Sequence, residues 1–338
     1  MNNKNNKYIR YHLVNEMLET VSIIRDFDTR KVETRIPIEI DARIMLTGEG
    51  SSRLFPAKNI RHHSLMLGRG PDFFTEGASQ LLNYKLNAFT VIGASNSGKT
   101  KEIVHLFCKL ADQGHKALYS VTCNPGTLLE NHSHGSVSLN IAPELAIAAS
   151  KSVVAQALVY ECLLKNLLAY NFSFAELSEK FQLALSNEID PEIINSLVNA
   201  GTIFYSGYNN GVAEELTLKT NEILRKKSGF LPGTYLLHGI EEVIQKNDVI
   251  ILMDPIESEF EKIYEVYVKN IGATVVAITN NATPFINISI PESDQFQNSY
   301  LKLASGWNLL VEAGIKLNVQ LDKPVRARKI GNEYKVAT

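Results

Sequence analysis

The sequence has few cysteines, little net charge and no long apolar run, and each absence narrows the possible function. Its 338 residues contain three cysteines, Cys108, Cys123 and Cys162, which are scattered and form no Cys-x-x-Cys pair. A disulfide framework is therefore not expected, and a reduced, cytoplasmic setting is the simplest interpretation. The formal net charge of −2 argues against a protein whose main function is to bind nucleic acid.

Membrane, export and metal-binding signals are also missing. No stretch reaches the roughly 18 continuous apolar residues that span a bilayer, and the polar start, MNNKNNKYIRYH, has no apolar signal region. The pairs His62-His63 and His132-Ser133-His134 lack the carboxylates or further ligands that a zinc site needs. We therefore expect no membrane contact and no metal site, and we assign no cofactor.

What the sequence does have is an almost regular alternation of strand and helix patterns. Strands are expected at Arg43 to Thr47, Ala88 to Gly93, Ala117 to Thr122, Thr202 to Tyr205, Asp248 to Met253, Val275 to Thr279 and Ile286 to Ile288. Helices are expected at Tyr11 to Phe27, Glu76 to Tyr84, Lys101 to Leu110, Leu145 to Leu168, Phe174 to Leu185, Pro191 to Val198, Val212 to Lys226, Phe260 to Asn270 and Ser299 to Leu317. This order predicts an α/β fold with a mainly parallel sheet covered by helices.

The alternation runs through two rounds of similar length, with a boundary near residues 170 to 195. A chain of 338 residues has room for one large or two medium domains. We expect a helical segment at 1–34, a first α/β unit with the phosphate-binding loops at 35–170, a second unit at 171–320, and a tail at 321–338 that closes the site.

Residues 93 to 100, GASNSGKT, fit two phosphate-binding patterns at once. Gly93-x-x-x-x-Gly98-Lys99-Thr100 satisfies the nucleotide P-loop pattern, while Ser95-x-Ser97-Gly98-x-Thr100 is a hydroxyl-rich loop suited to a sugar phosphate. Either way, an apolar strand precedes the loop and a helix follows it. Backbone N–H groups and the helix dipole would then face an anion, so the loop predicts a phosphate site.

Two other loops could reach the same crevice. Gly48-Glu49-Gly50-Ser51-Ser52 follows an expected strand and offers flexible glycines with two hydroxyl groups. Thr127 follows the turn Asn124-Pro125-Gly126. In α/β sheets, ligands collect outside the carboxyl ends of strands, where such loops converge. A tight turn with capping serines, and a turn-making threonine, remain the simpler alternatives.

The second half of the chain contributes titratable groups. Glu215, Lys219 and Glu222 are spaced four and three apart, so they share one helix face. That spacing is typical of a surface ion-pair ladder, but it also suits a general base beside an ammonium group. His238 lies between apolar residues and Gly239, where a buried structural histidine is the plainer interpretation.

Taken in order, these pieces resemble the sugar isomerase (SIS) family. They resemble above all the isomerase half of glucosamine-6-phosphate synthase, amino-sugar phosphate deaminases and fructosamine-6-phosphate deglycases. The matching residues are Gly48 to Ser52; Ser95, Ser97, Gly98 and Thr100; Thr122 to Thr127; Glu144, Ala148, Ser150 and Lys151; Glu215, Leu218, Lys219 and Glu222; His238-Gly239; and Asp322, Pro324 and Lys329. Each motif alone is weak, but their collinear order over nearly the whole chain is specific.

The resemblance implies two SIS subdomains, each a three-layer αβα sandwich, in a homodimer or dimer of dimers with shared active sites. It implies a phosphate held by Ser51, Ser52, Ser95, Ser97 and Thr100, with Gly50, Asn96, Thr127 and Glu215 as further substrate contacts. His238 of the partner subunit would open the sugar ring. Glu222 would move a proton between C1 and C2, Lys219 would support the enediol oxyanion, and Lys329 would engage the open-chain carbonyl, with a Schiff base as one option.

Three departures from the family pattern bear on the reaction. Ile240 follows His238-Gly239 where the family often has proline, and Glu49 stands where the synthase often has a smaller or thiol residue. No glutaminase domain precedes residue 35, and Met1-Asn2 offers no nucleophilic cysteine. We therefore expect degradation of an amino sugar: a deaminase/isomerase that converts glucosamine 6-phosphate to fructose 6-phosphate and ammonia.

Other interpretations stay open at this point. Fructosamine-6-phosphate deglycation and plain aldose–ketose isomerisation use the same motifs. A P-loop NTPase would use Lys99 on the phosphates, Thr100 on magnesium and Asp254 after the strand DVIILM. A non-catalytic sugar-phosphate sensor is a further alternative.

Overall fold

The computed structural model describes residues 1–2, 4–326 and 333–334, and these form two compact units. One, the first-sheet unit, comprises Ile23–Glu144 and Ala149–Ser173 together with residues from Arg326–Thr338. The other, the second-sheet unit, comprises Met1–Ser22, Leu145–Ala148 and Phe174–Val325. Lys329 lies outside the described residues.

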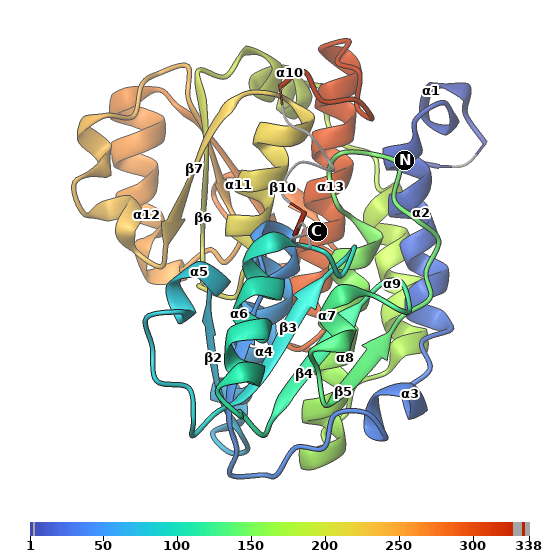
Figure 1. The fold of residues 1–338 in the computed structure, drawn as a ribbon. Coiled ribbons are helices and arrows are strands. Elements are labelled where there is room, and N and C mark those ends of the chain that lie inside the picture. Colours follow the sequence, from blue (N-terminus) through green and yellow to red (C-terminus); the bar gives the residue numbers. More distant parts are fainter. Residues whose placement is uncertain (3, 327–332, 335–338) are drawn as a thin grey trace. The chain divides into compact units, whose positions relative to one another are not determined.

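The first-sheet unit contains five parallel strands in the order β2-β1-β3-β4-β5 (Figure 1). Their bounds are β1 (Arg43–Thr47), β2 (Asp72–Glu76), β3 (Thr90–Ser95), β4 (Leu118–Thr122) and β5 (Gly135–Ser138). The helices and turns around them are α3 (Arg30–Glu33), η1 (Gly50–Ser52), α4 (Leu54–Leu67), α5 (Ala78–Leu81), α6 (Lys101–Asp112), α7 (Leu128–Asn131) and α8 (Lys151–Leu168). The chain leaves β1 toward one edge of the sheet and β3 toward the other. Because such crossovers are right-handed, α4 and α6 cover opposite faces.

Apolar periodicity explains why these elements form and where they pack. Helix α6 buries Ile103, Phe107 and Leu110 along one stripe, and this stripe meets β-strand residues such as Val91 and Leu118 in the core of the unit. On the other face, α8 is buried along most of its length and packs on α4.

The second-sheet unit also contains five parallel strands, in the order β10-β9-β8-β6-β7. Their bounds are β6 (Thr202–Gly207), β7 (Lys227–Pro232), β8 (Val249–Leu252), β9 (Thr274–Thr279) and β10 (Ile286–Ser289). The helices are α1 (Asn6–Ile9), α2 (His12–Arg25), α9 (Phe174–Ser186), α10 (Pro191–Asn199), α11 (Val212–Ile223), η2 (Tyr235–Leu237), η3 (Ile240–Glu242), η4 (Glu257–Glu259), α12 (Phe260–Ile263), the π-helix η5 (Tyr264–Ile271) and α13 (Asn298–Lys316). Helix α11 packs on β6, β7 and α13, and α13 packs in turn on α9 and α10.

The predicted fold class is confirmed: two parallel five-stranded sheets with flanking helices stand where an α/β fold was expected. Three strands were missed, namely β2, β5 and β7, and all three lie at sheet edges. Edge strands are only partly buried and carry no continuous apolar run, so the pattern that reveals a central parallel strand is absent. No helix among the described residues is long and apolar enough to cross a membrane.

Two expected helices differ from the structure. The helix expected from Leu145 begins only at Lys151, because the Glu144 carboxylate accepts the N–H groups of Ser150 and Ser152 and so defines the helix start. The helix expected from Glu76 is reduced to the single turn α5, since Glu76 itself ends β2.

Two buried tyrosines allow a direct test of the packing. Tyr160 on α8 and Tyr205 on β6 are both buried. The Tyr205 hydroxyl lies 2.8 Å from the Thr220 hydroxyl, whereas the Tyr160 hydroxyl has no hydrogen-bond partner among the described residues. We expect Tyr160→Phe to raise the free energy of unfolding by about 1 kcal/mol and Tyr205→Phe to lower it by a similar amount. Urea unfolding of both variants measures this, and a loss of stability in both would contradict it.

Candidate functional site

The strand order of the first sheet places two loops side by side. Strands β1 and β3 are neighbours, with Thr47 opposite Gly93, and the chain leaves them in opposite directions. The crevice at such a reversal is where ligands bind in α/β sheets. Loops 48–52 and 95–100 both start at this point, which we call the hydroxyl edge.

Loop 95–100 is closed by its own hydroxyl groups. The Ser95 hydroxyl accepts the Gly98 N–H at 3.0 Å and lies 2.8 Å from the Thr100 hydroxyl. Gly98 has a φ of +63°, and its carbonyl accepts the Leu129 N–H at 3.0 Å. Helix α6 begins directly after this loop at Lys101, so its free N–H groups face the same place.

The five hydroxyl residues predicted to bind phosphate all belong to these two loops. Ser51 and Ser52 form the 3₁₀ turn η1 together with Gly50. Ser95 is buried, Thr100 is half-buried and Ser97 is exposed. Ser97 accepts the Lys99 N–H at 3.2 Å. The edge therefore offers hydroxyl groups and helix N–H groups that together can hold an anion.

Asn96 and Thr127, expected as further substrate contacts, make bracing contacts in the structure. The Asn96 amide donates to the Glu144 carboxylate at 2.8 Å. Thr127 is the N-cap of α7. Its hydroxyl accepts the Glu130 N–H, and the Glu130 carboxylate accepts the Thr127 N–H. The role of Glu130 was missed, although Thr127-x-x-Glu130 is a capping box that the sequence displays.

Carboxyl groups flank the hydroxyl edge. Burial raises the pKa of Glu49, and although the Ala78 N–H bonds to this carboxyl, the neighbouring Glu102 adds to the increase. Arg53, which follows η1, lies close enough to oppose that increase weakly. Glu49 therefore holds its proton more readily than an exposed glutamate does.

In the second-sheet unit, Lys219 lies on α11 between two carboxylates. Its ammonium nitrogen is 3.1 Å from Glu215 and 2.8 Å from Glu222. The Lys219 and Glu215 side chains are fully buried, while the Glu222 side chain is 27% exposed. Burial alone would lower the pKa of Lys219, but the two carboxylates outweigh it and hold the pKa above its ordinary value.

That burial excludes one of the two interpretations of this spacing. A surface ion-pair ladder is excluded, because Lys219 and Glu215 have no exposed side-chain surface. Lys219 is instead a buried ammonium group beside a carboxylate, Glu222, that solvent still reaches. This combination is compatible with a general base and an oxyanion partner.

His238 is exposed and follows the 3₁₀ turn η2, where its N–H bonds to the Tyr235 carbonyl. The alternative of a buried structural histidine is therefore wrong. Gly239 follows it with a φ of +100°, a conformation that favours glycine.

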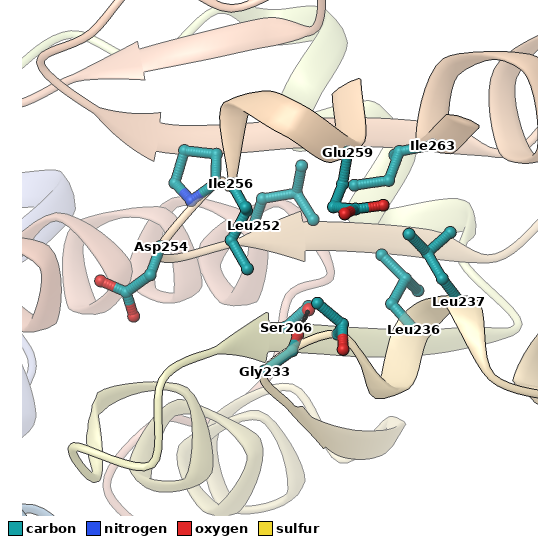
Figure 2. Close-up of a pocket in the computed structure, with 11 residues that line it drawn as sticks. Ser206, Gly233, Leu236, Leu237, Leu252, Asp254, Ile256, Glu259 and Ile263 are labelled. Atoms are coloured by element: carbon teal, nitrogen blue, oxygen red, sulfur yellow. Dashed lines mark hydrogen bonds between the residues drawn. The ribbon is translucent and has the colours of Figure 1, made fainter. Parts of the chain in front are cut away.

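The second sheet has its own reversal, between β6 and β8, and a crevice lies there. Figure 2 shows its lining, in which the Asp254 and Glu259 carboxylates stand among apolar side chains. The cavity measures about 20 Å³, room for about one water molecule. Asp254 bonds to Lys302 at 2.5 Å and accepts the Tyr208 N–H at 2.9 Å. The cavity at this edge is therefore too small for a sugar phosphate.

The hydroxyl edge lies within a match to a known family. Residues 39–166 match the model of the SIS domain. The chain contains an SIS domain. A relative from Schizosaccharomyces pombe, described as a probable glutamine–fructose-6-phosphate aminotransferase (isomerizing), is 25% identical over 257 residues. This match covers 70% of the chain but only 37% of that relative.

Several solved structures match the fold of nearly the whole chain. The C-terminal domain of glucosamine-fructose-6-phosphate aminotransferase from Francisella tularensis matches with a TM-score of 0.75 at 16% identity, covering 95% of this chain and all of that one. A glucosamine-6-phosphate deaminase from Thermotoga maritima gives 0.75 at 17% identity, covering 96% and 99%. A tagatose-6-phosphate ketose/aldose isomerase from Escherichia coli gives 0.70 at 16% identity, covering 94% and 96%.

The closed loop of the SIS domain depends on Gly98. A Cβ at Gly98 would lie 2.3 Å from Thr127 atoms, whereas a Cβ at Gly114, which also has a positive φ, would meet nothing within 4 Å. We expect Gly98→Ala to lower the free energy of unfolding by about 3 kcal/mol, and Gly114→Ala by only about 1 kcal/mol. Thermal unfolding of both variants checks the difference. Equal losses would mean that the contact with Thr127 has no cost.

Proposed function

We propose that the protein is an enzyme that processes a sugar phosphate by moving a proton between C1 and C2. One observation carries this proposal: Lys219 is buried and held charged beside the partly exposed Glu222. The hydroxyl edge supports it by offering hydroxyl groups and a helix N-terminus to an anion. The SIS domain and the fold of the matched structures agree with this assignment.

In the proposed reaction, Ser51, Ser52, Ser95, Ser97 and Thr100 bind the phosphate. Glu222 removes the proton from one carbon and returns it to the next, and the Lys219 ammonium group stabilises the negative charge that develops on the enediol oxygen. Because Lys219 is already paired with carboxylates and buried away from water, this step requires little reorganisation of the groups around it. We propose that the enzyme is a homodimer in which His238 of the partner subunit opens the sugar ring. Lys329 would engage the carbonyl.

Among the reactions open to such a site, we favour deamination of glucosamine 6-phosphate to fructose 6-phosphate and ammonia. The Thermotoga maritima structure named as a glucosamine-6-phosphate deaminase supports this choice. Plain aldose–ketose isomerisation is the second candidate, favoured by the match to the Escherichia coli tagatose-6-phosphate isomerase. Deglycation of a fructosamine 6-phosphate requires the same proton transfer.

A nucleotide-binding role fits the geometry less well. Thr100 shares a hydrogen bond with Ser95, and Asp254, its proposed partner on magnesium, is already paired with Lys302. In a P-loop enzyme both groups hold one metal ion.

Glu222→Gln tests the proton transfer. The amide keeps the shape and can still accept from Lys219, but it cannot act as a base, so we expect kcat to fall by about 10²–10⁴-fold with little change in KM. Ammonia release and ketose formation are measured with glucosamine 6-phosphate, a fructosamine 6-phosphate and aldose 6-phosphates. Glu179→Gln, which changes an exposed glutamate on α9, is the matched control. Unchanged turnover in Glu222→Gln would overturn the proposal.

Lys99→Ala separates the sugar and nucleotide interpretations. Lys99 is exposed and has no assigned role in the proposed reaction, so we expect sugar-phosphate turnover to change less than about threefold. A P-loop enzyme would lose ATP binding, since its lysine contacts the phosphates directly. Isothermal titration with ATP and magnesium measures nucleotide binding, and the turnover assay measures sugar-phosphate processing.

A further inference from the structure

We propose that Glu144 is a positioning residue: its carboxylate holds the 95–100 loop against the start of helix α8 and thereby sets the shape of the phosphate site. This inference rests on the proposed function for its ligand, but its structural part can be tested without any ligand.

The Glu144 carboxylate is buried, and both of its oxygens accept hydrogen bonds. One oxygen accepts the N–H groups of Ser150 and Ser152 at 2.8 and 3.1 Å. The other accepts the Ser152 hydroxyl at 2.7 Å and the Asn96 amide at 2.8 Å. These four bonds engage both oxygens of the carboxylate. Three of them start helix α8, and the fourth leads to the phosphate loop.

The fourth bond joins the Glu144 carboxylate to Asn96, within loop 95–100. Asn96 stands between Ser95 and Ser97, two of the predicted phosphate-binding residues, and its own carbonyl accepts the Cys123 N–H at 3.2 Å. Both the main chain and the side chain of Asn96 are therefore held. Because Ser95 and Ser97 are its direct neighbours in sequence, a movement of Asn96 would displace the hydroxyl groups on either side.

Helix α8 gives this bond a wider effect. It packs on α4, where His63 lies 3.0 Å from Glu161, and Arg69, just after α4, donates to the Leu168 carbonyl at 3.3 Å. Helix α4 follows directly on η1, the turn that contains Ser51 and Ser52. By tying loop 95–100 to α8, Glu144 therefore fixes it relative to the helix pair that carries the other hydroxyl loop.

A carboxylate suits this task although it lies near an anion site. Its charge faces the N-terminus of an 18-residue helix, where the helix dipole favours a negative group. Lys151, also buried, is the first residue of that helix. The negative charge is therefore balanced locally, and it need not repel a bound phosphate.

A reciprocal exchange isolates the Asn96–Glu144 bond. In Glu144→Gln, the new amide nitrogen faces the Asn96 amide, so two donors meet and the bond is lost. In Asn96→Asp, two carboxylates meet. In the double variant, the glutamine at position 144 can donate to the aspartate at position 96, while the glutamine oxygen still accepts the α8 N–H groups. Ser152→Ala is the matched control, because it removes another bond to the same carboxylate and leaves Asn96 untouched.

Hydrogen exchange of the backbone amides in residues 95–100 reports on positioning without ligand. We expect exchange to accelerate about tenfold or more in both single variants, to return near the wild-type rate in the double variant, and to stay unchanged in Ser152→Ala. Wild-type exchange in Glu144→Gln, or no recovery in the double variant, would overturn the inference.

Binding and turnover show whether positioning serves the phosphate. With inorganic phosphate as the probe, and with the sugar phosphate that the enzyme turns over, we expect Kd and KM to rise about tenfold in Glu144→Gln. We expect kcat to change less than about threefold, with recovery in the double variant. A loss of thermal stability without a change in Kd or KM would mean that Glu144 only caps a helix, against the inference. If the wild-type protein turns over no sugar phosphate, the proposed function fails, and the exchange rates still decide the role of Glu144.

Discussion

Parallel strands with right-handed crossovers impose the constraint on which the candidate site depends. Every strand of such a sheet presents its carboxyl end at one edge, and only where the strand order reverses do two successive loops diverge and leave a crevice. In the first sheet, this point lies between β1 and β3. The residues that follow these strands thus lie side by side, although α4, β2 and α5 separate them in sequence.

The two sheets share this topology but differ in the side chains that they place at the reversal. The first presents hydroxyl groups, a glycine with positive φ and the start of a 12-residue helix. The second presents Asp254 and Glu259 around a small cavity, with Lys302 already paired. A similar backbone therefore yields an edge lined by hydroxyl groups once and an internally neutralised crevice once. The fold alone does not determine what binds.

The amino-acid sequence was sufficient for the central strands, for most helices and for both hydroxyl loops. These features depend on local patterns: apolar runs for β3 and β8, and small or hydroxyl residues directly after β1 and β3. The edge strands β2, β5 and β7 were not predicted, because half-buried strands carry a weaker pattern. The burial of Lys219 was equally hidden, since spacing places it beside Glu215 and Glu222 but does not say what covers that face. The late start of α8 depends on Glu144, whose side chain bonds to residues both far before it and just after it.

Cys123 illustrates a consequence of this bracing. Its backbone N–H bonds to the Asn96 carbonyl, and the residue is 1% exposed. Burial, with the nearby Glu144 charge, raises the pKa of this thiol far above its ordinary value. Reaction with oxidants or alkylating agents requires an accessible thiolate. We therefore expect the Cys123 thiol to be unreactive, so that loop 95–100 does not respond to redox conditions through this residue.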